Sequence, residues 1–109
     1  MTVDRPDDQE SMRVRLLRDV RTVFQSRNGV RGIATTDLLD ALHAMEESPW
    51  LTYYGRGLDP RDLSSLLAHY GIGPKPLRVR AKFRDQYGGK DVVKGYKRDD
   101  LHDAWERYL

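Results

Sequence analysis

Lysines, arginines and glycines crowd into one stretch near the C-terminus, KFRDQYGGKDVVKGYKR, which covers residues 82–98. Glycines beside a lysine can form a loop that holds phosphate, whereas a row of cations can neutralise a polyanion. In a P-loop, Gly-Lys is followed by Ser or Thr and opens a helix. Here Asp91 follows Lys90, where its charge would repel phosphate, and the next residues are β-branched. The residues therefore argue against a P-loop.

The other residue types that support catalysis or metal binding are scattered. His43, His69 and His102 fall in three different predicted helices, and none has a second ligand spaced to share a helical turn. Paired carboxylates occur in the acidic N-terminal stretch and at predicted helix ends, where acidic side chains commonly cap the helix or face solvent. Because the members of a Ser-His-Asp triad meet only in the folded chain, sequence spacing leaves this alternative open. No serine, however, has the glycine pattern of a nucleophile elbow. We expect no catalytic residue, no cofactor and no metal site.

The net charge of +2 over 109 residues hides a strong asymmetry. Residues 1–10 carry four acids and one arginine, whereas residues 74–98 carry nine Lys or Arg and two aspartates. A local basic block indicates a polyanionic partner better than the whole-chain balance does. The alternative interpretation is a solvated charged surface.

Composition predicts one domain without a membrane segment. Hydrophobic residues make up 39% of the chain and charged residues 33%, and no apolar run approaches the ~20 residues that span a bilayer. Cysteine is absent, which fits a cytoplasmic protein. We expect a flexible acidic leader or linker end at residues 1–10, unlike a signal peptide, and a single domain at residues 11–109.

Apolar periodicity predicts four helices. The first covers residues 11–27 and ends at an Asn-Gly pair. Capping residues begin the other three, namely Thr35, Asp59 followed by proline, and Asp99. The expected buried stripes are Leu16, Leu17, Val20, Val23 and Phe24; Leu38, Leu39, Leu42 and Met45; Leu63, Leu66, Leu67 and Tyr70; and Leu101, Ala104, Trp105 and Tyr108.

Short β-branched or alternating segments predict three strands, at residues 30–34, 76–80 and 92–98, with a Gly-Gly turn between the last two. The resulting order is helix, short strand, helix, helix, two strands, helix. This is the order of a winged helix-turn-helix closed by a further C-terminal helix. We therefore predict an α+β, mainly helical fold in which a β-hairpin forms the wing.

Strand alternation gives this wing two faces. If it continues past residue 80, Arg78, Arg80, Lys82 and Arg84 share one face and Leu77, Val79 and Phe83 the other. Phe83 and Tyr87 could stack on bases of a single strand. The more ordinary interpretation places Phe83 in the core and Tyr87 in the turn.

Nucleic acid, above all DNA, is the partner that this pattern favours. The third helix would present Arg61, Ser64 and Ser65 to the major groove. That face offers few base-reading residues, and the connection before it is longer than in a usual helix-turn-helix, so backbone contacts should dominate. The expected phosphate contacts are Lys75, Arg78, Arg80, Lys82, Arg84, Lys90, Lys94 and Lys97.

A second hypothesis belongs to a different class. The segment EESPWLTYYGRGL breaks the helical pattern, and we expect a loop whose aromatics, Trp50, Tyr53 and Tyr54, pack over an edge of the core. If these aromatics form an apolar surface, the domain would dock onto another protein. A third hypothesis is a small transcriptional regulator, which would bind as a symmetric dimer.

Four segments carry a family resemblance: LLRDVRTVF, IATTDLLDALHAMEESPW, LDPRDLSSLLAHYGI and KGYKRDDLHDAWERYL. Together, over roughly Arg15 to Leu109, they resemble the winged-helix-like C-terminal domain of unknown function in actinobacterial phage, plasmid and mobile-element primase–helicase proteins. In those proteins an ATP-hydrolysing motor precedes the domain, and the ATPase motifs belong to that motor. The resemblance therefore assigns no catalytic residue to this chain. It implies a role in DNA replication, with an upstream ATPase domain or a replisome protein as partner. Residues 81–91 are longer and more basic than the short turn of that family, which enlarges the expected wing.

Overall fold

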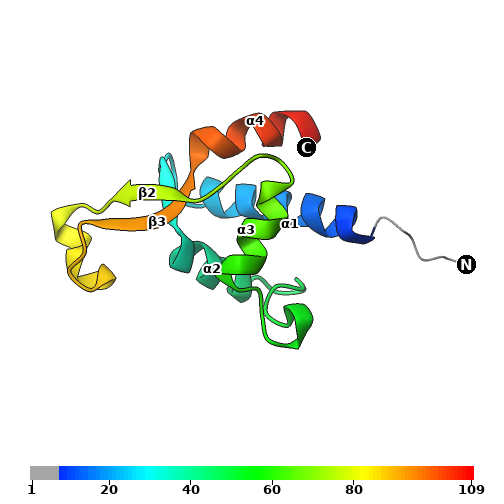
Figure 1. Ribbon diagram of the computed structural model, residues 1–109, viewed down its shortest axis with the longest axis horizontal. Helices are drawn as coiled ribbons and strands as arrows, with labels where there is room; N and C mark the ends of the chain where they lie inside the picture. Colours follow the sequence, from blue (N-terminus) through cyan, green and yellow to red (C-terminus); the bar gives the residue numbers. More distant parts are fainter. Residues whose placement is uncertain (1–7) are drawn as a thin grey trace, which may run out of the picture.

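The computed structural model describes residues 8–109, with side chains from residue 12 on. The helices and strands of this part follow the predicted order (Figure 1): α1 (Asp8–Gln25), β1 (Gly32–Ala34), α2 (Thr35–Ala44), α3 (Pro60–Ala68), β2 (Lys75–Arg78), β3 (Val92–Lys97) and α4 (Arg98–Tyr108). Two 3₁₀ segments are added, η1 (Tyr53–Gly55) and η2 (Ala81–Tyr87). Residues 1–7 of the expected leader lie outside the described part, and α1 begins three residues before its predicted start.

Helix α1 lies at the centre of the fold and packs against the other three helices. Figure 1 shows α4 along one side of it, α2 along the other, and α3 crossing it. Its apolar stripe is buried as predicted, and Leu16, Leu17 and Val20 are completely inaccessible. The predicted stripes of α2 and α3 are also buried, with Met45 and Tyr70 at the edge of the core.

The three strands form one small antiparallel sheet in the order β1-β3-β2. Strand β3 is therefore central, and it contacts both α2 and α4. Tyr96 lies opposite Ile33 on the face that enters the core, where both side chains are buried. The fold is thus mixed α+β and mainly helical. No helix within residues 8–109 is both long and apolar enough to cross a membrane.

Two predicted N-caps are wrong for one shared reason. Thr35 is the first helical residue of α2, and the extended residue Ala34 takes the N-cap position. Asp99 lies in the first turn of α4, and Lys97 takes the N-cap position. In both cases the strand runs directly into the helix, so its last residue already supplies the extended backbone that an N-cap needs. Asp59 is a true N-cap, because a loop precedes α3.

The hairpin of β2 and β3 projects away from the helices (Figure 1) and departs from the predicted alternation. Its ladder ends where Arg78 pairs with Val92, and residues 81–87 then coil into η2. If the ladder continued, residues 88–91 would face this segment, and they include two glycines and an aspartate, which strands disfavour. The predicted strand face through Lys82 and Arg84 is therefore wrong, and Phe83 is exposed at 39% rather than part of the core.

A smaller correction concerns the C-terminal end of α4. Leu101, Ala104 and Trp105 are buried as predicted, but Tyr108 is half exposed. Its ring packs beside that of Tyr70, with the two centroids 4.8 Å apart. The last turn of α4 therefore covers the edge of the core and does not enter it.

Candidate nucleic-acid interface

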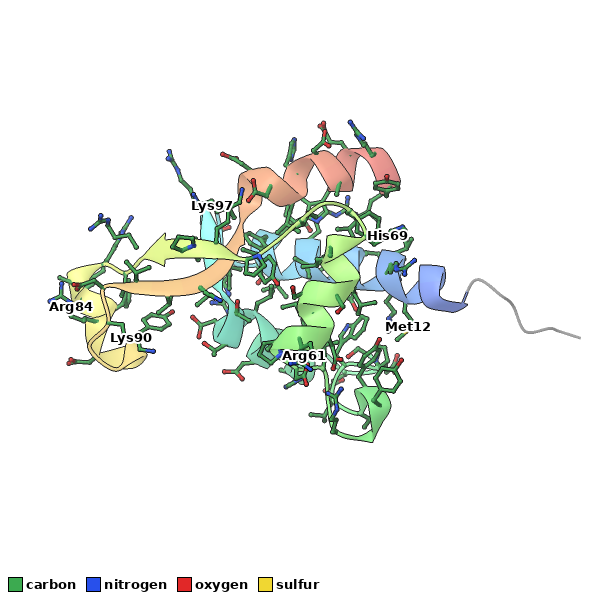
Figure 2. All side chains as sticks on the ribbon, in the orientation of Figure 1. Met12, Arg61, His69, Arg84, Lys90 and Lys97 are labelled. Atoms are coloured by element: carbon green, nitrogen blue, oxygen red, sulfur yellow. The ribbon has the colours of Figure 1, made fainter. Side chains whose placement is uncertain are left out.

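The projecting hairpin, residues 75–97, gathers the predicted cations on one arm. Figure 2 shows Arg84 and Lys90 at its far end and Lys97 where it joins the body. All eight predicted phosphate contacts on the hairpin are solvent-exposed: Lys75, Arg78, Arg80, Lys82, Arg84, Lys90, Lys94 and Lys97. Such a concentration of exposed cations attracts a polyanion, since each phosphate that it neutralises releases counterions.

Two of these cations are held by neighbouring acids. Lys75 Nζ lies 2.9 Å from a carboxylate oxygen of Asp100 in α4, and Arg84 Nη2 lies 2.9 Å from one of Asp91. The other six form no ion pair with any described side chain: Arg78, Arg80, Lys82, Lys90, Lys94 and Lys97. These six charges are the part of the hairpin most available to an external anion.

The sheet register divides the strand cations between two faces. Residues directly opposite each other in an antiparallel pair share a face, and neighbours along a strand alternate. Arg78 pairs with Val92, two residues from Lys94, which places Arg78 and Lys94 on one face. Lys75 pairs with Gly95, two residues from Lys97, which places these lysines on the other. A single nucleic acid backbone along one face cannot contact both sets.

A hydrogen bond ties the far end of the hairpin back to the body. The Tyr87 hydroxyl, at the end of η2, donates to a carboxylate oxygen of Asp37 in the first turn of α2. This bond to Asp37, with partial burial, raises the pKa of Tyr87 above its usual value. The sequence placed Tyr87 in a turn, but nothing in the local pattern indicated this partner fifty residues away. This hydrogen bond restricts movement of the hairpin relative to the helical body.

Helix α3 offers fewer side chains to a groove than predicted. Arg61 and Ser65 are exposed, and Figure 2 shows Arg61 near the N-terminal end of the helix. Ser64 is half-buried, and its side chain hydrogen-bonds the hydroxyl of Tyr96. Burial raises the pKa of Tyr96, and this hydrogen bond opposes that rise. Of the three predicted base-reading residues, only Arg61 and Ser65 remain open to a ligand.

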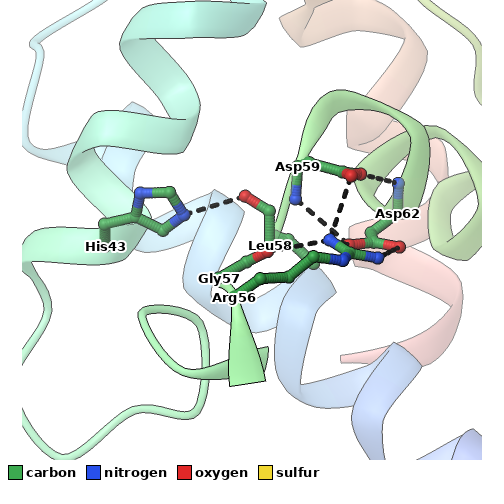
Figure 3. Close-up of polar contacts among 6 residues, drawn as sticks. All are labelled: His43, Arg56, Gly57, Leu58, Asp59 and Asp62. Atoms are coloured by element: carbon green, nitrogen blue, oxygen red, sulfur yellow. Dashed lines mark hydrogen bonds and ion pairs between the residues drawn. The ribbon is translucent and has the colours of Figure 1, made fainter. Parts of the chain in front are cut away.

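The first turn of α3 is occupied by its own capping network (Figure 3). The Asp59 side chain accepts from the Asp62 backbone N–H at 2.8 Å, and Asp62 accepts from the Asp59 N–H at 3.2 Å. Arg56 donates to both carboxylates, at 2.9 Å to Asp59 and 2.8 Å to Asp62. The hydrogen bond from Arg56 lowers the pKa of Asp62. Two carboxylates at this helix end leave little room for a phosphate there.

The histidines have local partners in the structure. A ring nitrogen of His43, Nε2, lies 2.8 Å from the Leu58 carbonyl oxygen beside the α3 cap (Figure 3), and Nε2 of His102 lies 3.2 Å from Glu106. His69 packs edge-to-face against Tyr70. Among the described residues, no three His, Asp or Glu side chains gather in a way that could hold a metal ion.

The aromatic loop between α2 and α3 presents a different surface from the one expected. Trp50 is completely buried, and its Nε1–H donates to Asp19 in α1 at 2.7 Å. Tyr53 is half-buried against the core. Leu51 and Tyr54 are instead exposed, at 60% and 71%. Any docking surface on this loop therefore consists of Leu51 and Tyr54, without Trp50.

Comparisons with known proteins give a family and a relative. Residues 1–108 match the family described as "Protein of unknown function (DUF3631)". The chain is 38% identical over 102 residues to a Saccharopolyspora erythraea protein described as "Uncharacterized 28.9 kDa protein in xis 5'region". That match covers 94% of this chain but only 35% of the relative, so the chain spans about a third of the relative's length. No solved structure matches the chain significantly.

Proposed function

The chain belongs to the DUF3631 family of proteins of unknown function, and we propose that it is a non-catalytic DNA-binding domain. One observation carries the proposal: six exposed cations without an acidic partner among the described side chains lie on a single projecting hairpin. Only two acids, Asp85 and Asp91, lie on the same arm, and Arg84 already pairs with Asp91. The net field of this arm attracts phosphates, whose contacts position a protein on DNA without reading sequence.

The arrangement of elements supports a winged helix as the form of this domain. The hairpin follows α3 in the chain, and β1 pairs with β3 at the base of the hairpin, which is the element order that a winged helix uses. In this proposal α3 lies along a groove through Arg61 and Ser65, and the hairpin acts as the wing. The hairpin supplies most of the affinity, because α3 offers only two open polar side chains.

The biological context that we propose is replication of a mobile element. The segments noted in the sequence resemble the C-terminal domain of phage and plasmid primase–helicases. The S. erythraea relative is described as a protein of an xis 5' region. Because that relative is longer, an accompanying ATPase domain is part of the proposal.

The test is a fluorescence-anisotropy titration with duplex DNA across a salt series. We choose Arg80→Glu combined with Lys90→Glu, because neither side chain has an ion-pair partner among the described residues. The control combines Arg18→Glu with Arg107→Glu, two exposed positions on α1 and α4 that change the net charge equally, while Arg107 also gives up its ion pair with Asp103. The hairpin variant should bind more weakly and lower the slope of log K against log salt by about two, one for each lost phosphate contact.

Both variants should keep the helical circular-dichroism spectrum, since all four positions are exposed. The control should retain most of its affinity and its slope. If both variants lost the same DNA affinity, the effect would come from net charge and not from the hairpin. If the hairpin variant bound DNA as the wild type does, the hairpin would not be part of the interface.

Docking onto another protein is the second candidate function, and the exposure of Leu51 and Tyr54 favours it. These side chains lie on the α2–α3 loop, apart from the cationic hairpin. Exposed apolar side chains that form a contiguous patch mark contact sites, whereas singly scattered ones need no such explanation. A wild-type protein without salt-sensitive DNA binding, together with a complex that Tyr54→Ser weakens, would favour docking onto an ATPase or replisome partner.

A further inference from the structure

Phe83 is an exposed aromatic ring on the most cationic part of the molecule. It lies in η2 at the far end of the hairpin, with 39% of its surface accessible. A 3₁₀ helix turns by about 120° per residue, so Phe83 points about a third of a turn away from Tyr87. Tyr87 faces α2 and donates to Asp37, and the same turn therefore directs Phe83 away from α2. No apolar cluster of the described core includes Phe83.

The surroundings of this ring suit a base with its phosphate. Lys82 Nζ lies 5.2 Å from the ring centroid, within the range of a cation–π contact. Arg80 and Lys90 are exposed close by along the chain, and neither has an acidic partner among the described side chains. Exposed aromatics flanked by cations are the usual elements of single-strand binding, in which bases stack on rings and phosphates contact Lys and Arg.

We propose that Phe83 stacks on an unpaired base, so that the preferred ligand of the hairpin is a DNA fork or a duplex end with a single-stranded tail. This inference rests on the proposed DNA-binding function. Inside a duplex both faces of a base are covered by its neighbours, whereas an unpaired base offers a free face. The two-faced distribution of cations fits the same ligand, because two diverging backbones can each follow one face. Arg78 and Lys94 lie on one face, and Lys97 lies on the other beside Lys75, which Asp100 already pairs.

The experiment compares a blunt duplex with the same duplex carrying two unpaired arms, by anisotropy at fixed salt. The wild-type protein should prefer the forked substrate. Phe83→Ala should lower affinity for the fork about tenfold, within the range for loss of one stacked base, and leave the blunt duplex nearly unchanged. Phe83→Trp should keep the preference. Tyr108→Ala, which removes an exposed aromatic on α4, is the matched control and should change neither affinity.

A second readout reports stacking directly. A 2-aminopurine base placed at the fork should lose fluorescence when wild-type protein binds and recover it with Phe83→Ala. A Phe83→Ala variant that binds fork and blunt duplex as the wild type does would overturn the inference while leaving backbone binding intact. A wild-type protein that binds neither substrate would overturn the proposed function together with the inference.

Discussion

Gly95 in the central strand lies where the hairpin packs closely against β1. A Cβ atom built there would overlap the Ile33 carbonyl oxygen and a Leu77 methyl, and would lie 2.8 Å from the Ala34 Cα. Leu77 crosses the sheet above this glycine and also contacts the position of a Cβ on Gly32, at 3.0 Å. The absence of a side chain at Gly95 is what lets Leu77 cover the sheet at the base of the arm.

We therefore expect Gly95→Ala to destabilise the fold by about 1–3 kcal/mol, the usual cost of overpacking. Gly73→Ala is the matched control, because a Cβ at Gly73 meets nothing within 4 Å and its backbone lies outside the left-handed region. That control should be neutral or slightly stabilising, by up to about 1 kcal/mol. Urea unfolding measures both, and equal stabilities of the two variants would contradict the close approach.

Trp50 lies in the loop between α2 and α3, and the local sequence does not reveal how deeply it is buried. Its segment contains proline, glycines and polar residues, which predict a loop with its aromatics packed over an edge of the core. The indole is nevertheless fully buried, because its N–H reaches Asp19 on α1, thirty-one residues earlier, and satisfies its only polar atom. Local composition predicts the loop, but a hydrogen bond between distant residues determines which of its aromatics face solvent.

At the scale of elements, the N-termini of α3 and α4 carry similar sequences with different structural roles. Each has near its start an aspartate, Asp59 or Asp99, that the sequence predicts as an N-cap. Asp59 accepts a backbone hydrogen bond and shares a reciprocal capping box with Asp62, whereas Asp99 makes no such bond and lies inside the first turn. The difference arises because α4 continues from a strand without a loop.

Asp59→Ala should consequently cost about 1 kcal/mol of unfolding free energy, as for the loss of a side-chain N-cap. Asp99→Ala should cost only a few tenths of a kcal/mol, through its weak interaction with the helix dipole. Chemical denaturation of the two variants under identical conditions provides the comparison. A larger loss from Asp99→Ala would mean that its side chain, and not the extended residue Lys97, caps α4.

At the scale of the whole molecule, the order of helices and strands and most of the core could be predicted from the sequence. Periodic apolar residues specify which helix face is buried, and this information is local. The path of η2, the engagement of Ser64 by Tyr96 and the tie from Tyr87 to Asp37 depend on pairs that meet only in the folded chain. The same limit applies to the candidate site. Its cations were identified by composition, but which of them are paired and which face they share could not be predicted.

The orientation of the hairpin against the body is also a property of the whole molecule. We expect the hydrogen bond from the Tyr87 hydroxyl to Asp37 to help maintain it. Removal of that hydroxyl in Tyr87→Phe should lower stability by only about 1 kcal/mol, as for one partly exposed hydrogen bond. Local motion should change more than global stability, because the central strand β3 still pairs with both β2 and β1. We expect faster amide exchange in residues 79–91, with exchange in α1 unchanged.

The pKa of Tyr87 gives this tie a pH dependence of known sign. Since its pKa is raised in the folded state, the hydroxyl stabilises the fold fully below its ordinary pKa near 10 and loses that contribution as pH rises through the higher folded value. The stability advantage of wild type over Tyr87→Phe should therefore be constant at neutral pH and vanish in strong alkali, where a phenolate would face Asp37. Tyr108→Phe, at an exposed ring on α4, is the control for the loss of a phenol hydroxyl. An advantage that persists unchanged above the folded pKa would contradict a stabilising role for the proton that Tyr87 donates to Asp37.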